Sequence, residues 1–261
     1  RRDADPLAAY SNYDTSAALG GFDYALGGDL LAGGFISYET TEFDLDVYAG
    51  SSTVESVTAG VYASHRRGAL DVSATAFGGV GDYESRRSVV RTKLGQWVAS
   101  TTEGTRYGAK IGAAYRFQFP WLEVTPTVAL QYLRWDAKAF SEAGSSEANL
   151  RVKYQTETSI AARGGVRLAR TFAVGRGELR PFVNIAWQQE FNDDDREMKA
   201  DIFGGTVTTY APGIESGGVR LDCGLDWKIT DAIGVNARYL TERGGAQDES
   251  VGIRGGVTIA F

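Results

Sequence analysis

The segment 219–229 alternates between apolar and charged or small side chains, and this alternation constrains the fold more than any other feature. One parity holds Val219, Leu221, Cys223, Leu225, Trp227 and Ile229, and the other holds Arg220, Asp222, Gly224, Asp226 and Lys228. A period of two is typical of a β-strand with different surroundings on its two faces. In a membrane, an Arg or Lys that faced lipid at the midplane would cost about 2–4 kcal/mol. The charged parity is therefore expected to face inward.

Two further segments show the same pattern. In 178–191 the outward set is Leu179, Pro181, Val183, Ile185, Trp187 and Phe191, opposite Arg180, Asn184, Gln188 and Glu190. In 107–118 the outward set is Tyr107, Ile111, Tyr115 and Phe117, opposite Lys110, Arg116 and Gln118. A charged interior differs from the aliphatic interior of a soluble barrel. A soluble sandwich with polar outer faces predicts the same alternation, so this pattern alone leaves both architectures open.

The lengths of the connections favour a barrel. The expected strands are 14–26, 30–42, 54–64, 69–83, 104–118, 121–136, 153–174, 178–191, 215–229, 233–242 and 250–261. Short connections at 27–29, 66–68, 119–120, 175–177 and 230–232 alternate with long ones at 43–53, 84–103, 137–152, 192–214 and 243–249. All long loops then lie at one end, as in outer-membrane barrels and unlike Greek-key sandwiches. The sequence predicts an all-β, antiparallel, up-and-down transmembrane β-barrel.

Composition agrees with this architecture. The chain has 33 Gly, 13 Tyr, 12 Phe and 5 Trp, which suit tight turns and aromatic girdles. It has no run of eighteen apolar residues, which excludes a transmembrane helix but not a barrel, since alternation escapes hydropathy averaging. A net charge of −6 argues against nucleic-acid binding, and a single cysteine excludes an intramolecular disulfide.

The number of strands raises a question about the start of the barrel. If the chain ends in the periplasm, the strand at 14–26 begins outside the cell. Bacterial single-chain barrels have an even number of strands, and an open edge cannot stand in lipid. We therefore expect one barrel domain over 1–261, with about eleven of twelve strands visible. The twelfth strand would precede Arg1 or form within 1–13.

Several stretches resemble the β-domains of autotransporters. "LRPFVNIAWQQEFNDDD" (179–195) is similar to a late strand and acidic loop of that family, and "VTPTVALQYLR" (124–134) with "FSEAG" (140–144) to its middle strand and loop. "FDYALGGDLLAGGFISY" (22–38) resembles the early hairpin, and "CGLDWKITDAIGVNARYLTE" (223–242) the penultimate hairpin. The matches follow the family order. The family's first strand and the helix that threads its barrel are not seen.

The resemblance implies a type V secretion translocator in the outer membrane of a Gram-negative bacterium. Its partners would be its own upstream passenger and linker segment, lipid and lipopolysaccharide, and the outer-membrane barrel assembly machinery. That machinery reads the last strand, so Phe261 is the expected assembly signal, supported by Val251, Ile253, Val257 and Ile259. Phe261 is equally well explained as an apolar anchor. The resemblance further implies a monomeric barrel that is not an enzyme, with no cofactor, metal or nucleic acid.

The lumen wall is expected to carry charged residues from neighbouring strands that form ion pairs: Arg163, Glu190, Arg220, Asp222, Asp226, Arg238, Glu242 and Arg254. Structural stiffening and hydration of the wall is the simpler interpretation of this set. Some autotransporters cut their linker inside the barrel with a linker Asn and inward carboxylates. Because no linker is visible here, the sequence assigns no nucleophile.

Other candidates have simpler interpretations. His65, the only histidine, lies near a periplasmic turn, which is the wrong end for an outer-membrane hydrolase. Cys223 is a packing residue facing lipid. The acidic loop 192–197 lacks the spacing and glycine of an EF-hand, so a solvated loop is expected. The pairs Arg66–Arg67 and Arg86–Arg87 suit turns or lipid head groups. A stand-alone porin and an outer-membrane hydrolase are the alternative functions.

Overall fold

The computed structural model describes residues 11–45, 50–89, 96–144, 149–192, 196–202, 205–211, 217–244 and 249–260. These residues form β-strands, turns and irregular connections, and no α-helix occurs among them. Within the same ranges, no helix has the length and apolar character needed to cross a membrane. Phe261 and residues 1–10 lie outside the described residues.

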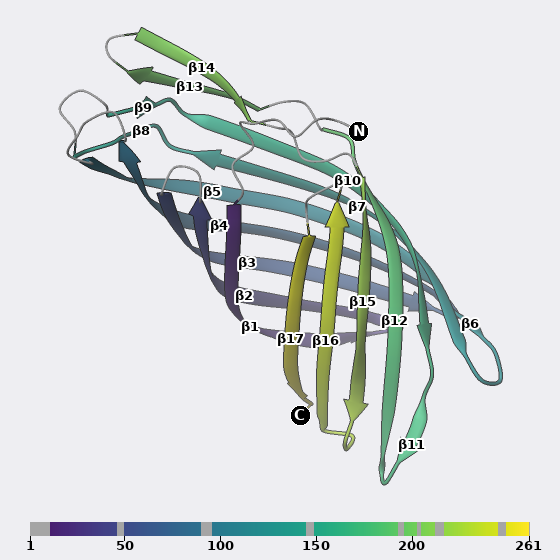
Figure 1. Ribbon diagram of the computed structural model, residues 1–261. Helices are drawn as coiled ribbons and strands as arrows, with labels where there is room; N and C mark the ends of the chain where they lie inside the picture. Colours follow the sequence, from purple (N-terminus) through teal and green to yellow (C-terminus); the bar gives the residue numbers. More distant parts are fainter. Residues whose placement is uncertain are drawn as a thin grey trace.

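All of the expected strands are confirmed, in chain order, in one antiparallel sheet (Figure 1). They are β1 (Ser11–Gly27), β2 (Leu30–Leu45), β3 (Gly50–Arg67), β4 (Leu70–Val89), β5 (Gln96–Tyr115), β7 (Glu123–Ala137), β10 (Gln155–Ala169), β12 (Gly177–Glu190), β15 (Gly217–Lys228), β16 (Ile233–Gly244) and β17 (Glu249–Ile259). Each strand pairs with the next along this path. The sheet curls, as an up-and-down barrel wall does.

Two expected strands are interrupted. The stretch 153–174 divides into β10 and β11 (Phe172–Val174), and 104–118 divides into β5 and β6 (Phe117–Gln118). β10 and β11 keep one register against β12, but the ladder lapses opposite Pro181. Proline has no N–H to donate, so a continuous ladder cannot form there.

Two expected long loops are mostly strand. β2 and β3 pair up to Leu45 and Gly50, and β4 and β5 pair up to Val89 and Gln96, so the loops expected at 43–53 and 84–103 are wrong in their bounds. β4 and β5 each have 20 residues. About 9–11 residues of a tilted strand cross a bilayer. These hairpins therefore continue beyond the membrane.

A second, smaller sheet lies at the same end as the long connections (Figure 1). It contains β8 (Phe140–Ser141), β9 (Arg151–Val152), β13 (Arg196–Ile202) and β14 (Gly205–Ala211), in the order β14-β13-β9-β8. The connections expected at 137–152 and 192–214 are thus partly strand. β8 follows β7, β9 precedes β10, β13 follows β12 and β14 precedes β15, so the small sheet repeats the order of the wall beneath it. β6 and β11 lie at the opposite end.

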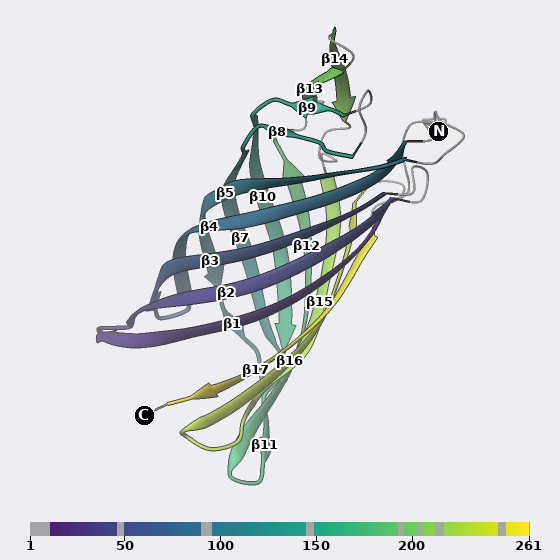
Figure 2. The ribbon, with the colours of Figure 1, turned by 90° about the vertical axis from the view of Figure 1, so that its left-hand side faces the viewer.

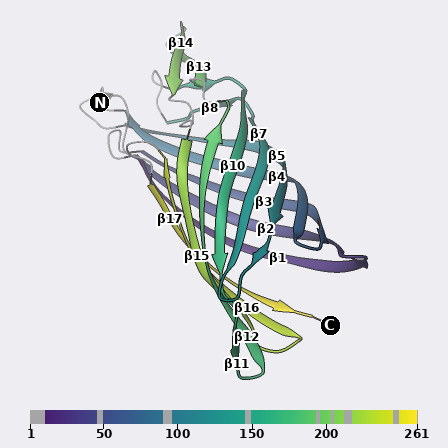
Figure 3. The same ribbon diagram turned by 90° about the vertical axis from the view of Figure 1, so that its right-hand side faces the viewer.

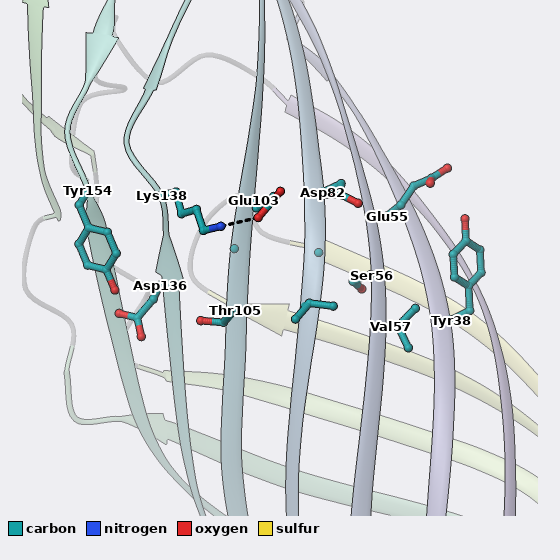
Figure 4. Close-up of a pocket in the computed structure, with 13 residues that line it drawn as sticks. Tyr38, Glu55, Ser56, Val57, Asp82, Glu103, Thr105, Asp136, Lys138 and Tyr154 are labelled. Atoms are coloured by element: carbon teal, nitrogen blue, oxygen red, sulfur yellow. Dashed lines mark hydrogen bonds and ion pairs between the residues drawn. The ribbon is translucent and has the colours of Figure 1, made fainter.

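The outer face carries a band of apolar side chains with a charged boundary. Val57, Val61 and Val80 are exposed on this face. Glu55, Asp82 and Glu103 stand directly above Val57 and Val80 on three adjacent strands, in register with one another (Figure 4). We call these three carboxylates the acidic row. Carboxylates avoid hydrocarbon, so the acidic row marks the outer limit of the membrane on this side.

A pocket of about 620 Å³ opens on the outer face beside the acidic row (Figure 4). Val57 and Val80 line it with Tyr38 and Tyr154, and Lys138 donates a hydrogen bond to Glu103 Oε2 across 2.5 Å at its upper edge. This ion pair raises the pKa of Lys138 above its ordinary value. The pocket thus lies at the boundary between lipid and water, away from the inner face of the sheet.

On the inner face, aromatic rings pack against glycines of the neighbouring strand. A Cβ added to Gly33 would come within 2.5 Å of the Tyr62 ring, and one added to Gly108 within 2.7 Å of the Phe77 ring. Only glycine leaves room for this approach. The rings therefore cover the wall between β2 and β5 and fill part of the interior.

The two edges of the sheet are β1 and β17 (Figures 2 and 3). In the described ranges no ladder joins them. The backbone N–H and C=O groups along each free edge need partners in a lipid environment.

Candidate functional site in the barrel lumen

The candidate site is the inner face of the curled sheet, here called the lumen wall. The structure places the predicted inward charges on the parity opposite the apolar outer residues: Arg163, Glu190, Arg220, Asp222, Asp226, Arg238, Glu242 and Arg254. Strict alternation along each strand produces this separation. The eight residues do not form one continuous ion-pair network.

Arg220 and Glu242 form a direct pair across β15 and β16. They face each other in the ladder, and Arg220 Nη1 lies 3.2 Å from Glu242 Oε2. Opposite charges in register on neighbouring strands stabilise a sheet by roughly 0.2–1 kcal/mol. This pair thus ties the two strands together on the lumen side.

Asp226 forms ion pairs with two arginines. Arg167 Nη2 donates to Asp226 Oδ2 at 2.9 Å, and Arg238 Nη2 lies 3.6 Å from Asp226 Oδ1. Both guanidinium groups also lie over the ring of Phe182, at 3.9 Å and 5.3 Å from its centroid. Phe182 is buried. Cation–π contacts of this kind strengthen when they are shielded from water, so Asp226 and Phe182 hold the two arginines against the wall.

Sequence reasoning missed Phe182 and Arg167. Phe182 belongs to the polar parity of β12, between Arg180 and Asn184, and an aromatic ring in that set is a signal that the sequence did contain. It indicates a packing partner inside the lumen. The partner could not be identified from sequence, because Arg167 and Arg238 come from β10 and β16.

Glu190 is 3% exposed and has no ion-pair partner among the described residues. Its carboxylate accepts hydrogen bonds from Ser159 Oγ at 2.7 Å, from the Ile160 backbone N–H at 2.7 Å and from the Asn192 N–H at 3.2 Å. The ladder between β10 and β12 ends at this point. Glu190 therefore satisfies backbone donors where the strands separate, a role that differs from the expected ion pairing.

Three predicted lumen residues are not paired with an opposite charge among the described residues. Arg163 donates to the neutral side-chain oxygen of Gln188. Arg254 lies opposite Arg238 in the ladder, and Asp222 Oδ1 is a buried acceptor for which the described residues supply no donor. Some charged residues of the lumen wall thus have oppositely charged partners in the described ranges, and these three do not.

Two further residues of the lumen wall, Arg106 and Glu123, each contact more than one side chain and were not predicted; we call them hubs. Arg106 on β5 donates to Thr58 Oγ1 at 2.9 Å and to Ser56 Oγ at 3.1 Å, which links it to β3. Glu123 at the start of β7 accepts from Arg180 and lies 3.5 Å from Arg116 Nε. Each hub connects strands that are not neighbours.

The predicted assembly residues occupy the outer face of β17. Val251, Ile253, Val257 and Ile259 are all exposed there, Ile253 by 83%. In a bilayer this surface would contact lipid. Phe261 lies outside the described residues.

The remaining candidates are separated from the lumen. His65 lies on the outer face of β3, opposite Leu30 and Val72. Cys223 lies on the outward parity of β15, half-buried. Residues 193–195 of the acidic loop 192–197 lie outside the described residues, and β13 begins at Arg196. In the described ranges, His65 and the lumen carboxylates therefore stand on opposite faces of the sheet, which does not suit acid–base catalysis by this histidine.

An antiparallel sheet in up-and-down order, with an apolar outer face and a charged inner face, defines the class of outer-membrane β-barrels. The sequence matches the family described as autotransporter beta-domain over residues 1–240. The chain belongs to this family. Its function is that of an autotransporter translocator barrel, which carries an attached passenger. No curated protein matches the chain in a sequence search.

Solved structures of the same kind share the fold. The translocator domain of autotransporter NalP from Neisseria meningitidis matches with a TM-score of 0.76 at 15% identity, covering 96% of this chain and 82% of that one. The β domain of the Bordetella autotransporter BrkA matches at 0.74 and 19%, covering 96% and 92%. The transport unit of AIDA-I from Escherichia coli matches at 0.58 and 12%, covering 96% and 83%.

Proposed function

We propose that this barrel stands in the outer membrane of a Gram-negative bacterium and anchors a passenger, encoded upstream of Arg1, at the cell surface. The observation that carries the proposal is a charged lumen wall inside an apolar outer face, in a chain of the autotransporter β-domain family. A charged wall stays hydrated, so it can accommodate a polypeptide segment whose backbone is not yet paired.

Surface labelling of intact cells tests this function. An epitope tag placed upstream of Arg1 in the full-length protein is expected to bind antibody on unbroken cells. Deletion of residues 1–261 is expected to abolish that signal, with total expression measured in lysed cells as the control. Equal surface signal after the deletion would contradict the proposal, and a tag that never reaches the surface would favour a stand-alone porin.

We further propose that a strand from upstream of β1 closes the barrel between β1 and β17. Both edges lack a partner in the described residues, and open edges are not tolerated in lipid. Amide hydrogen exchange distinguishes a barrel closed by an upstream strand from one whose two edges stay open. Amides on the outer edges of β1 and β17 are expected to exchange slowly in the full-length protein and rapidly in a chain that starts at Arg1. Equal rates would refute an upstream closing strand.

The closing strand β17 is proposed to carry the signal for the barrel assembly machinery. Phe261→Ala is expected to reduce the amount of barrel inserted in cells more than it reduces the stability of the barrel once folded. Phe172→Ala is the matched control, since Phe172 is also an exposed aromatic residue. Insertion of Phe261→Ala at the parent level would contradict the proposal.

The barrel is proposed to act as a monomer in contact with lipid and lipopolysaccharide, without catalytic activity. The orientation of His65 toward the outer face supports the last point. His65→Ala is expected to leave surface delivery of the passenger unchanged. Loss of a hydrolytic activity in that variant would instead support the outer-membrane hydrolase.

A further inference from the structure

Three basic side chains converge on the lumen wall from alternate strands. Lys110 comes from β5, Arg163 from β10 and Arg220 from β15, separated by β7 and β12. All three belong to the inward parity of their strands. Gly112, two residues after Lys110, pairs with Ala129, which in turn pairs with Arg163. Gly218, two residues before Arg220, pairs with Gln188, which also pairs with Arg163. The three basic residues therefore lie in successive inward rows of the sheet. We call these three residues the basic triad.

The protein compensates the basic triad only in part. Arg220 is paired with Glu242, which also attracts Arg163. Arg163 otherwise donates to neutral Gln188, and its Nε is buried without a partner among the described residues. Lys110 has no ion pair in the same ranges. Of the three basic residues, Arg220 alone has an ion pair among the described residues.

Other carboxylates on this part of the wall do not complete the compensation. Glu190 is occupied by Ser159, Ile160 and Asn192. Asp222 is the next inward residue to Arg220 on β15, but it forms no ion pair with a described basic residue, and its buried Oδ1 has no donor among the described residues. Like charges held close in a partly shielded site destabilise one another unless an opposite charge joins them.

We propose that Lys110, Arg163 and Arg220 form an anion-binding site on the lumen wall, which takes a carboxylate or a small inorganic anion. Arg163 offers its unpartnered Nε–H as a directed donor, and Lys110 offers a mobile ammonium group. Rings of basic side chains favour anions in pores. The proposed site requires the closed barrel of the proposed function. It adds anion binding to what the lumen of that barrel does.

The anion has two possible sources, an acidic side chain of the upstream segment or an anion from solution. Zero-length carbodiimide coupling of the full-length protein distinguishes them, because it joins an amine only to a carboxylate in contact with it. Mass spectrometry then identifies the peptide joined to Lys110. The second measurement is the reversal potential of single barrels in a planar bilayer under a KCl gradient, which gives the ratio of chloride to potassium permeability.

The test variant is Lys110→Gln with Arg163→Gln, and the matched control is Arg67→Gln with Lys138→Gln, which removes two basic residues from the outer face instead. In the parent, chloride is expected to be the more permeant ion. The permeability ratio is expected to fall by about threefold or more in the test variant and to stay unchanged in the control. Circular dichroism confirms that both variants fold.

Coupling of Lys110 to an upstream carboxylate would support the site with the chain as the source of the anion. Lowered chloride preference in the test variant without such coupling would support the site with solution anions as its ligand. Coupling of Lys110 to a carboxylate within residues 11–260, or no coupling and no change in selectivity, would overturn the proposal. A barrel that passes these tests but fails surface delivery would refute the proposed function and leave the site intact.

Discussion

Glu190 provides the sharpest test of how the lumen wall is held together. Its carboxylate accepts two hydrogen bonds of 2.7 Å, one from Ser159 Oγ and one from the Ile160 N–H, in a site that is 3% exposed. A hydrogen bond to a charged group contributes about 1.5–3 kcal/mol. Glu190→Ala removes both and leaves a backbone donor unpaired. We expect the free energy of unfolding to fall by about 3–5 kcal/mol.

Glu190→Gln should lose less, about 1–2 kcal/mol, because the amide oxygen can still accept from Ile160. Urea unfolding of the full-length protein in lipid vesicles, followed by tryptophan fluorescence, measures both variants. The matched control is Glu178→Ala, which removes the same charge from the exposed end of the same strand and should change stability by less than about 0.5 kcal/mol. If Glu190→Ala and Glu178→Ala cost the same, the capping role of Glu190 is wrong.

Three other predictions address the lumen, the wall and a turn. Asp226→Ala leaves two lumen arginines without their carboxylate and should lower the urea midpoint, whereas Asp226→Asn should lower it less. Gly108→Val should reduce folded yield, because an added Cβ meets the backbone oxygen of Tyr132 at 2.6 Å and the Phe77 ring at 2.7 Å, and Phe77→Ala should restore the yield only in part. The hydrogen bond from Lys228 lowers the pKa of Asp231 below its ordinary 3.8. The stabilisation that this hydrogen bond gives the folded protein is present above pH 3.8 and is lost as the pH falls through the lowered pKa. In Lys228→Gln, the pKa of Asp231 measured by NMR titration should rise toward its ordinary value. An unchanged pKa would refute the pairing.

The strands and their faces could be predicted because alternation is local. In 219–229 the polarity of each side chain indicates the face of the sheet on which it lies. The free-energy cost of a charge in lipid then assigns the apolar face to the outside. The bounds of the hairpins could not be predicted in the same way. β4 and β5 continue past the membrane through residues that are polar on both faces, such as Glu84 and Ser85, and such residues are as common in loops as in solvated strands.

The contacts of the lumen wall were harder to predict than its charges. Arg220 and Glu242 are direct ladder neighbours, so a hairpin register suffices to pair them. Asp226 contacts Arg167 across an intervening strand. Such contacts follow from curvature, which a period-two pattern does not encode.

The acidic row fixes how thick a membrane this barrel can accept. From Val57 to His65 the outward positions of β3 cover nine residues, which is about 26 Å along the strand and about 20 Å along the membrane normal at a tilt of about 40°. The usual apolar band is about 25 Å tall. Lipids beside β3–β5 must therefore compress by a few ångströms, since the carboxylates resist sliding inward. The barrel is expected to thin the bilayer on one side, and thin bilayers are where it should fold most readily.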